Sequence, residues 1–251
     1  MLGTRRTRTV IGAIGTAGLL FGLSLIGPSS VDAEGVTDVA GRAFGIEGDL
    51  TVTPIDPQAE IIEFEIDPEP EVSLPPEGGE FAENETLFQV DDLVAVDTLR
   101  AATQGELGNA GGALSEATAD GFFLIDDIVV GDFIRGRCLD DQLDRIATTE
   151  LQDVRIDGVL QDTQPEPDTE ILVTDFGTVR LNVQEVLAGD VIRVTAMEIN
   201  IEDYELENGD LLSGQLRVGV AECGFDVDNE VIVIDDAVPA NAVQGDPDFT
   251  G

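Results

Sequence analysis

Residues 177–184 read Gly-Thr-Val-Arg-Leu-Asn-Val-Gln, and residues 215–220 read Gln-Leu-Arg-Val-Gly-Val. In both stretches apolar side chains alternate with polar or small ones. This period of two places the apolar side chains on one face of an extended strand and the others on the opposite face. Residues 62–66 and 199–202 repeat the alternation. The pattern predicts strands with one buried and one solvated face.

Turn signals separate these stretches, and Asn208-Gly209 is the strongest hairpin signal in the chain. No stretch has convincing helical periodicity, although residues 140–147 are compatible with one or two helical turns. We therefore predict an all-β chain that forms a single antiparallel β-sandwich of about ten strands over residues 34–236.

An acidic, proline-rich segment at residues 54–85 departs from this pattern. It holds six of the 11 prolines and 11 acidic residues, with no basic residue. Because proline has no amide hydrogen to donate to a ladder, the stretch Asp67-Pro68-Glu69-Pro70-Glu71 predicts an exposed extended loop. A strand before this stretch, within residues 59–66, is still possible.

The composition excludes several classes of function. The chain has 251 residues, 52 Asp and Glu, 12 Arg, no Lys and no His, and its net charge is −40. Such a charge repels phosphate backbones and anionic lipid headgroups, so we expect no nucleic-acid partner and no membrane docking of the mature domain. Without His or Lys, the chain lacks the residues for Ser-His-Asp catalysis, Schiff bases and His-ligated zinc.

Residues 1–33 resemble an export signal. Arg5, Arg6 and Arg8 form a positive start, residues 10–26 are apolar but contain four glycines, and small residues precede a cleavage site after Ala33. A permanent membrane anchor is the alternative, but 17 residues are marginal for a spanning helix. The sequence leaves open whether export is general or twin-arginine. Residues 237–251, which contain Pro and Gly, predict a flexible tail.

The chain has two cysteines, Cys138 and Cys223. In the oxidising compartment that the export signal predicts, the simple expectation is one disulfide. Two unpaired structural thiols are the alternative.

Six pieces of the chain resemble the choice-of-anchor P family of exported prokaryotic surface proteins. They are residues 40–46 (Ala-Gly-Arg-Ala-Phe-Gly-Ile), 132–138, 151–158 (Leu-Gln-Asp-Val-Arg-Ile-Asp-Gly), 177–185, 192–199 and 218–224 (Val-Gly-Val-Ala-Glu-Cys-Gly). The resemblance implies an extracellular β domain with the two cysteines paired. It implies no enzymatic activity, cofactor or catalytic residue. Unlike that family, this chain has no recognisable anchor, and it is unusually acidic.

Clustered carboxylates suggest a calcium site, because this cation prefers oxygen ligands. The best candidate is Asp226, Asp228 and Glu230, whose alternate positions can point the same way along an extended loop. The segment lacks the glycine and spacing of an EF-hand loop. The alternative is a solvated acidic surface suited to high salt, where charge repulsion is screened. We expect no other cofactor.

Two polar pairs have a structural and a functional interpretation. Arg135 and Arg137 can bind an anionic partner, since guanidinium groups bind carboxylates, but internal salt bridges are the simpler interpretation. Asn182 and Gln184 can bond a ligand or, more simply, neighbouring backbone.

These observations predict a non-enzymatic, structural or adhesive protein, secreted or held at the surface of a salt-adapted prokaryote. Its expected partners are other surface proteins or itself. The alternative is a secreted glycosidase-like hydrolase using an Asp/Glu pair. For such a site Phe122-Phe123 is a candidate sugar platform, although a buried strand is the simpler place for both rings.

Overall fold

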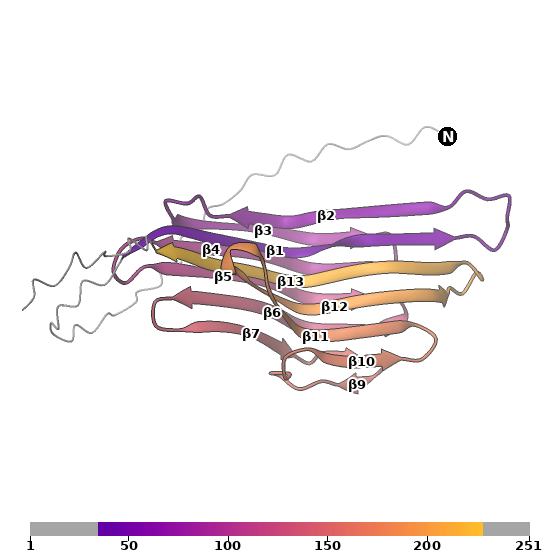
Figure 1. Cartoon of the computed structure of the whole chain (residues 1–251). Helices are drawn as coiled ribbons and strands as arrows, with labels where there is room; N and C mark the ends of the chain where they lie inside the picture. Colours follow the sequence, from indigo (N-terminus) through magenta and orange to yellow (C-terminus); the bar gives the residue numbers. More distant parts are fainter. Residues whose placement is uncertain (1–34, 228–251) are drawn as a thin grey trace, which may run out of the picture. The chain divides into compact units, whose positions relative to one another are not determined.

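The computed structural model describes residues 35–227, which form two antiparallel sheets packed face to face (Figure 1). Sheet A has the strand order β10-β11-β12-β13-β1-β2. Its strands are β1 (Val36–Thr53), β2 (Ile62–Ser73), β10 (Thr169–Val173), β11 (Gly177–Val186), β12 (Ile192–Glu205) and β13 (Leu211–Val227). Long central strands, β1 and β13, pair along most of their length.

Sheet B has the strand order β3-β4-β5-β6-β8-β9, and β7 also pairs with β6. Its strands are β3 (Gly79–Val90), β4 (Val94–Glu106), β5 (Gly112–Leu124), β6 (Val129–Asp141), β7 (Arg145–Gln152), β8 (Arg155–Ile156) and β9 (Val159–Leu160). Two short 3-10 turns, η1 (Ile125–Asp127) and η2 (Ala188–Asp190), complete the described part. No helix within residues 35–227 is long and apolar enough to cross a membrane.

The predicted antiparallel sandwich is confirmed, with 13 strands rather than about ten. Asn208-Gly209 forms the β12–β13 turn, where Gly209 has φ of 86° and the Asp210 amide donates to Asn208 Oδ1 at 3.0 Å. The helical turns considered for residues 140–147 do not form. Instead β6 ends at Asp141 and β7 begins at Arg145, and the Asp141 side chain accepts hydrogen bonds from the Leu143 and Asp144 amides.

The prediction that Asp67-Pro68-Glu69-Pro70-Glu71 forms an exposed loop is wrong, whereas the strand considered within residues 59–66 forms from Ile62. Residues 62–73 form β2, which pairs with β1, and the segment from Gly79 belongs to β3. The ladder tolerates Pro68 and Pro70 because β2 is the last strand of sheet A, and the register shifts between the pairs Ile46–Glu69 and Gly48–Ile66. Proline is compatible with edge strands and bulges, where an amide hydrogen is not needed.

An apolar core fills the space between the sheets, as one large cluster and two smaller ones, and the two cysteines belong to a smaller cluster. Phe176, Ile46, Leu99, Ile134 and Met197 are among its fully buried side chains. The two backbones come so close at one point that a Cβ atom on Gly136 of β6 would overlap the Gly219 carbonyl oxygen of β13. Glycine at position 136 therefore permits the close approach of the sheets.

Two cross-sheet links lie at one end of this core. The predicted disulfide is confirmed: Cys138 of β6 and Cys223 of β13 are bonded, with their Cα atoms 5.7 Å apart. Nearby, Arg145 of β7 donates two hydrogen bonds to the buried carboxylate of Asp140 and lies 3.0 Å from Asp190 of η2. These interactions raise the pKa of Arg145 and lower that of Asp190, so both groups stay charged.

A third link is a buried amide. Asn182 of β11, in the left-handed region at φ of 53°, donates to the Pro165 carbonyl at 2.8 Å and accepts from Thr149 of β7 and from Gln184. Gln184 also donates to the Ala147 carbonyl. Of the two interpretations of these residues, the structural one is therefore correct, because their amide groups join sheet A to sheet B.

The disulfide gives a first prediction. It closes a separation of 85 residues, so in the chain-entropy model its removal lowers the free energy of unfolding by about 4–5 kcal/mol. Denaturant unfolding of the C138S/C223S double variant, compared with the wild type in oxidising buffer, measures this loss. Reductant should shift only the wild type. A change below about 1 kcal/mol would contradict the assignment of this bond as a main cross-sheet link.

Candidate functional site

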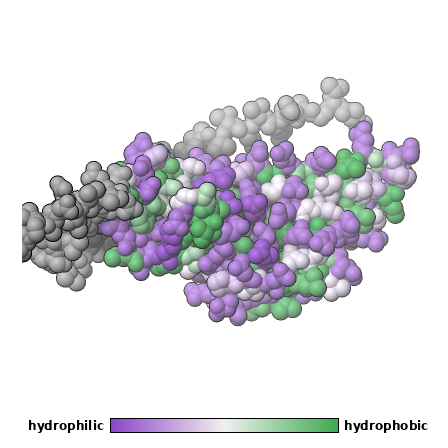
Figure 2. Space-filling view, in the orientation of Figure 1, coloured by the Kyte–Doolittle hydropathy of each residue, from purple (hydrophilic) through white to green (hydrophobic). Residues whose placement is uncertain are grey.

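The outer faces of the sheets, turned away from the core, are organised by charge. All nine arginines of residues 34–251 lie in the described part, and seven of them are within 4.0 Å of a carboxylate. On sheet A, Arg193 bonds Glu222 at 2.6 Å, and Arg42 bonds Glu71 at 2.6 Å. The visible face is accordingly mainly hydrophilic (Figure 2).

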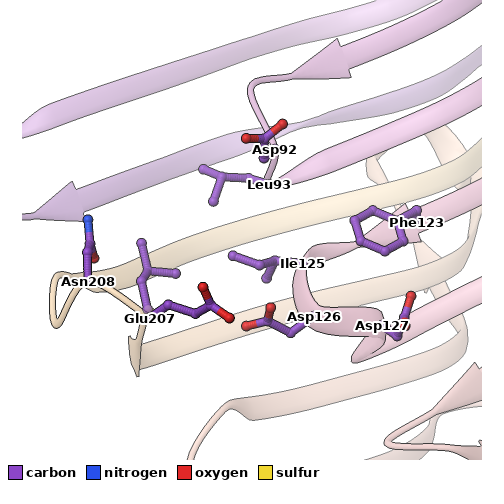
Figure 3. Close-up of a pocket in the computed structure, with 9 residues that line it drawn as sticks. Asp92, Leu93, Phe123, Ile125, Asp126, Asp127, Glu207 and Asn208 are labelled. Atoms are coloured by element: carbon purple, nitrogen blue, oxygen red, sulfur yellow. The ribbon is translucent and has the colours of Figure 1, made fainter.

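An open pocket of about 490 Å³ lies at the end of the sandwich opposite Val36 and Val227. The β3–β4 turn, η1 and the β12–β13 turn meet there. Its lining residues are Asp92, Leu93, Phe123, Ile125, Asp126, Asp127, Leu206, Glu207 and Asn208. Figure 3 shows the carboxylates of Asp126 and Glu207 facing each other, with Leu93 and Ile125 beside them. The pocket thus combines an apolar floor with a negative rim.

Tyr204 of β12 fixes one wall of this pocket. Its hydroxyl donates to Asp126 Oδ2 at 2.8 Å, and its ring packs edge-on against Phe176 with the centroids 5.5 Å apart. Burial first, then the hydrogen bond to Asp126 and the negative charges of Asp126 and Glu207, raise the pKa of Tyr204 to about 12. Asp126 itself has φ of 53°, so the η1 backbone turns its side chain toward Tyr204.

A raised carboxyl pKa occurs elsewhere, at Glu85 of β3. Burial and then the charge of Glu69 on β2 disfavour its ionised form. A general acid in a glycosidase needs such a raised pKa. However, Glu85 does not line the pocket, which offers only Phe123 as an aromatic wall. In a glycosidase the carboxyl group with the raised pKa must lie beside the bound sugar. Here Glu85, whose pKa is raised, lies outside the pocket.

The remaining predicted site residues have different outcomes. Arg135 is ion-paired with Glu116 at 3.6 Å and with Glu150, as the simpler interpretation expects. Phe122 is buried in the core, whereas Phe123 lines the pocket. Ala33, with the proposed cleavage site, and the tail at 237–251 lie outside the described residues.

Asp226 of the calcium candidate lies in β13 opposite Asp38, and Asp228 and Glu230 lie outside the described residues. Within residues 35–227, no group of three or more Cys, Asp or Glu side chains is arranged to hold a metal ion. Calcium binding at Asp226, Asp228 and Glu230 stays a prediction.

Neither the pocket nor the role of Tyr204 follows from local sequence patterns. Asp126-Asp127 is one of several adjacent acid pairs in the sequence, and nothing in the neighbouring residues distinguishes it from the others. The available signal was topological: the Asn208-Gly209 hairpin and the connection after β5 fall at the same end of an antiparallel sandwich. Comparison of the chain with family models, curated proteins and solved structures finds no match.

The environment of Tyr204 gives a second prediction. Because its pKa is raised from 10.0, the neutral phenol stabilises the fold below pH 10, and this stabilisation is lost as pH rises through about 12. Tyr204 is the only Tyr and the chain has no Trp, so ultraviolet absorbance of the phenolate follows this one group.

The folded chain should titrate near pH 12, and D126N should lower the midpoint toward 10, whereas the neighbouring D127N should change it little. A wild-type midpoint near 10 would contradict the pairing of Tyr204 with Asp126.

Proposed function

We propose that this chain is an exported, non-catalytic β-sandwich module with a structural or adhesive role, at or released from the surface of a salt-adapted prokaryote. The observation that carries the proposal is the buried Cys138–Cys223 disulfide between the two sheets. Such a bond persists in oxidising compartments and is rare in the cytosol. It agrees with the export signal predicted at residues 1–33 and with the resemblance to choice-of-anchor P proteins.

The position of the pocket, at the end of the sandwich opposite the first and last described strand residues, supports an adhesive role. Val36 and Val227 are paired at one end, and the pocket is formed by turns at the other end. A module held through either flanking segment would therefore present the pocket outward. Its negative rim and apolar floor favour basic, partly apolar groups on other surface proteins or on a second copy.

The acidic faces support salt adaptation. Without residues 1–33, which contain three Arg and one acid, 51 acids and nine Arg remain, a net charge of −42. Five of the seven ion-paired arginines are within 4.0 Å of two carboxylates, and the acids of residues 35–227 that form no ion pair are all at least partly exposed. Charge of this density keeps a protein soluble at high ionic strength, where repulsion is screened.

A secreted hydrolase is the competing hypothesis, and complementation tests the two together. Producer cells that lack the protein are complemented with the wild type, with D126N/E207Q or with E63Q/E65Q. The last variant removes two acids of β2 that do not line the pocket. Surface protein is measured by protease treatment of intact cells, and attachment by sedimentation.

We expect all three forms to reach the surface with a new start at Glu34. E63Q/E65Q should restore attachment within about twofold, the range of a small free-energy change, whereas D126N/E207Q should weaken attachment by more than this, because it removes the negative charge of the pocket rim. If D126N/E207Q reaches the surface normally but releases no sugar product that the wild type releases, the proposal fails and the hydrolase is favoured. Wild-type protein found only in the cytosol with Met1 intact would exclude export.

A further inference from the structure

An apolar row crosses the outer face of sheet B near the disulfide end. Leu114 of β5, Leu139 of β6 and Ile146 of β7 are direct cross-strand partners. Their neighbours Ser115, Cys138 and Ala147 point into the core, so this row points outward. Ile146 is 42% exposed and Leu143, at the tip of the β6–β7 turn, is 91% exposed. Side chains of this size side by side on an outer face mark an interaction surface.

The adjacent row on the same face contains Arg137, which, unlike Arg135, forms no ion pair within residues 35–227. Arg137 of β6 lies between Glu116 and Thr148 in the ladder, on the same face as Leu139. Arg135, one position further along this face, is within 4.0 Å of both Glu116 and Glu150. Arg137 is half-buried, and no carboxylate of residues 35–227 lies within ion-pair distance of it. The outer face of sheet B therefore presents an apolar row beside the positively charged side chain of Arg137.

The chain leaves the described part beside this surface. Val227 pairs with Val36, whose amide donates to the Gly108 carbonyl at 3.0 Å. The same carbonyl accepts from Gln142 in the β6–β7 turn at 3.3 Å. Residues 228–230, if extended, reach about 10 Å, which is enough to pass this turn.

The sequence that follows has the complementary chemistry. Residues 231–234 read Val-Ile-Val-Ile, with Glu230 before them and Asp235-Asp236 after them. Four β-branched apolar side chains match the row of Leu114, Leu139 and Ile146, and the flanking carboxylates match Arg137. We propose that residues 231–234 of the same chain dock across this apolar row, with an acid of Asp235-Asp236 paired to Arg137.

Docking would cover the apolar row and hold the last segment of the sequence against sheet B. It would also place residues 231–234 at the end of the sandwich opposite the pocket. This inference does not depend on the proposed function, because it concerns only contacts within the chain.

Hydrogen exchange of the full, disulfide-bonded chain tests the proposal. The amides of residues 231–234 should exchange at least about tenfold more slowly than those of an unstructured chain, as for a docked segment. L139E and, as a second disruption, I146E should remove this protection, whereas L172E, at an 80% exposed leucine of β10, should not. Protection of β4 and β5 amides checks that each variant is folded.

Exchanging the charges of Arg137 and Asp235-Asp236 tests the direction in which residues 231–234 lie across the apolar row. R137E should weaken the protection, and R137E combined with D235R/D236R should restore it. Unprotected residues 231–234 in the wild type, or protection insensitive to both L139E and I146E, would overturn the proposal. So would protection that disappears on dilution together with a dimer seen by light scattering, which would indicate exchange between copies. Protection of residues 10–26 in their place would likewise overturn it.

Discussion

Arg193 lies between Glu222 and Glu185 on the outer face of sheet A, and Arg42 lies between Glu222 and Glu71. This alternation of positive and negative side chains runs across five strands, from Glu185 of β11 to Glu71 of β2, and it organises the outer face of sheet A. After residue 33 there are 51 acids and only nine arginines. Five of these arginines are each within 4.0 Å of two carboxylates, so one guanidinium group compensates two negative charges. An exposed pair contributes only about 0.2–1 kcal/mol, but a row places like charges apart and opposite charges together.

Within residues 35–227, the carboxylates that form no ion pair are at least partly exposed to water. Some of them also protect the sheet edges. β2 and β3 are the outermost strands of their sheets on one side. Pro68 and Pro70 interrupt the free edge of β2. On β3, Glu85 lies opposite the buried Leu99 and interacts with Glu69, so a charged side chain occupies a position that faces the core. Prolines and inward charges on edge strands prevent pairing with another chain. Association through these edges is therefore disfavoured, and the pocket end or the face with the apolar row is the better contact surface.

Local rules account for what the sequence could predict. Alternation at residues 177–184 gave the buried and solvated faces of β11, and Asn208-Gly209 gave a hairpin because glycine tolerates the positive φ that the turn requires. The two cysteines allowed only one intramolecular pair. Non-local geometry accounts for what was missed. Whether a proline-rich stretch can be a strand depends on its being at an edge, and no property of residues 62–73 alone shows that. Tyr204 and Asp126 are 78 residues apart, and only the folded sandwich brings them together.

We infer that repulsion among exposed carboxylates, more than any single cross-sheet link, limits the stability of this sandwich. The most direct measurement is the free energy of unfolding of the disulfide-bonded chain between about 0.1 and 1 M sodium chloride with a chelator present, over which the screening length falls from about 10 to about 3 Å. The claim predicts a clear rise with salt, because screening relieves more repulsion among 51 acids than it weakens attraction to nine arginines. A free energy that is constant or falls over this range would contradict it.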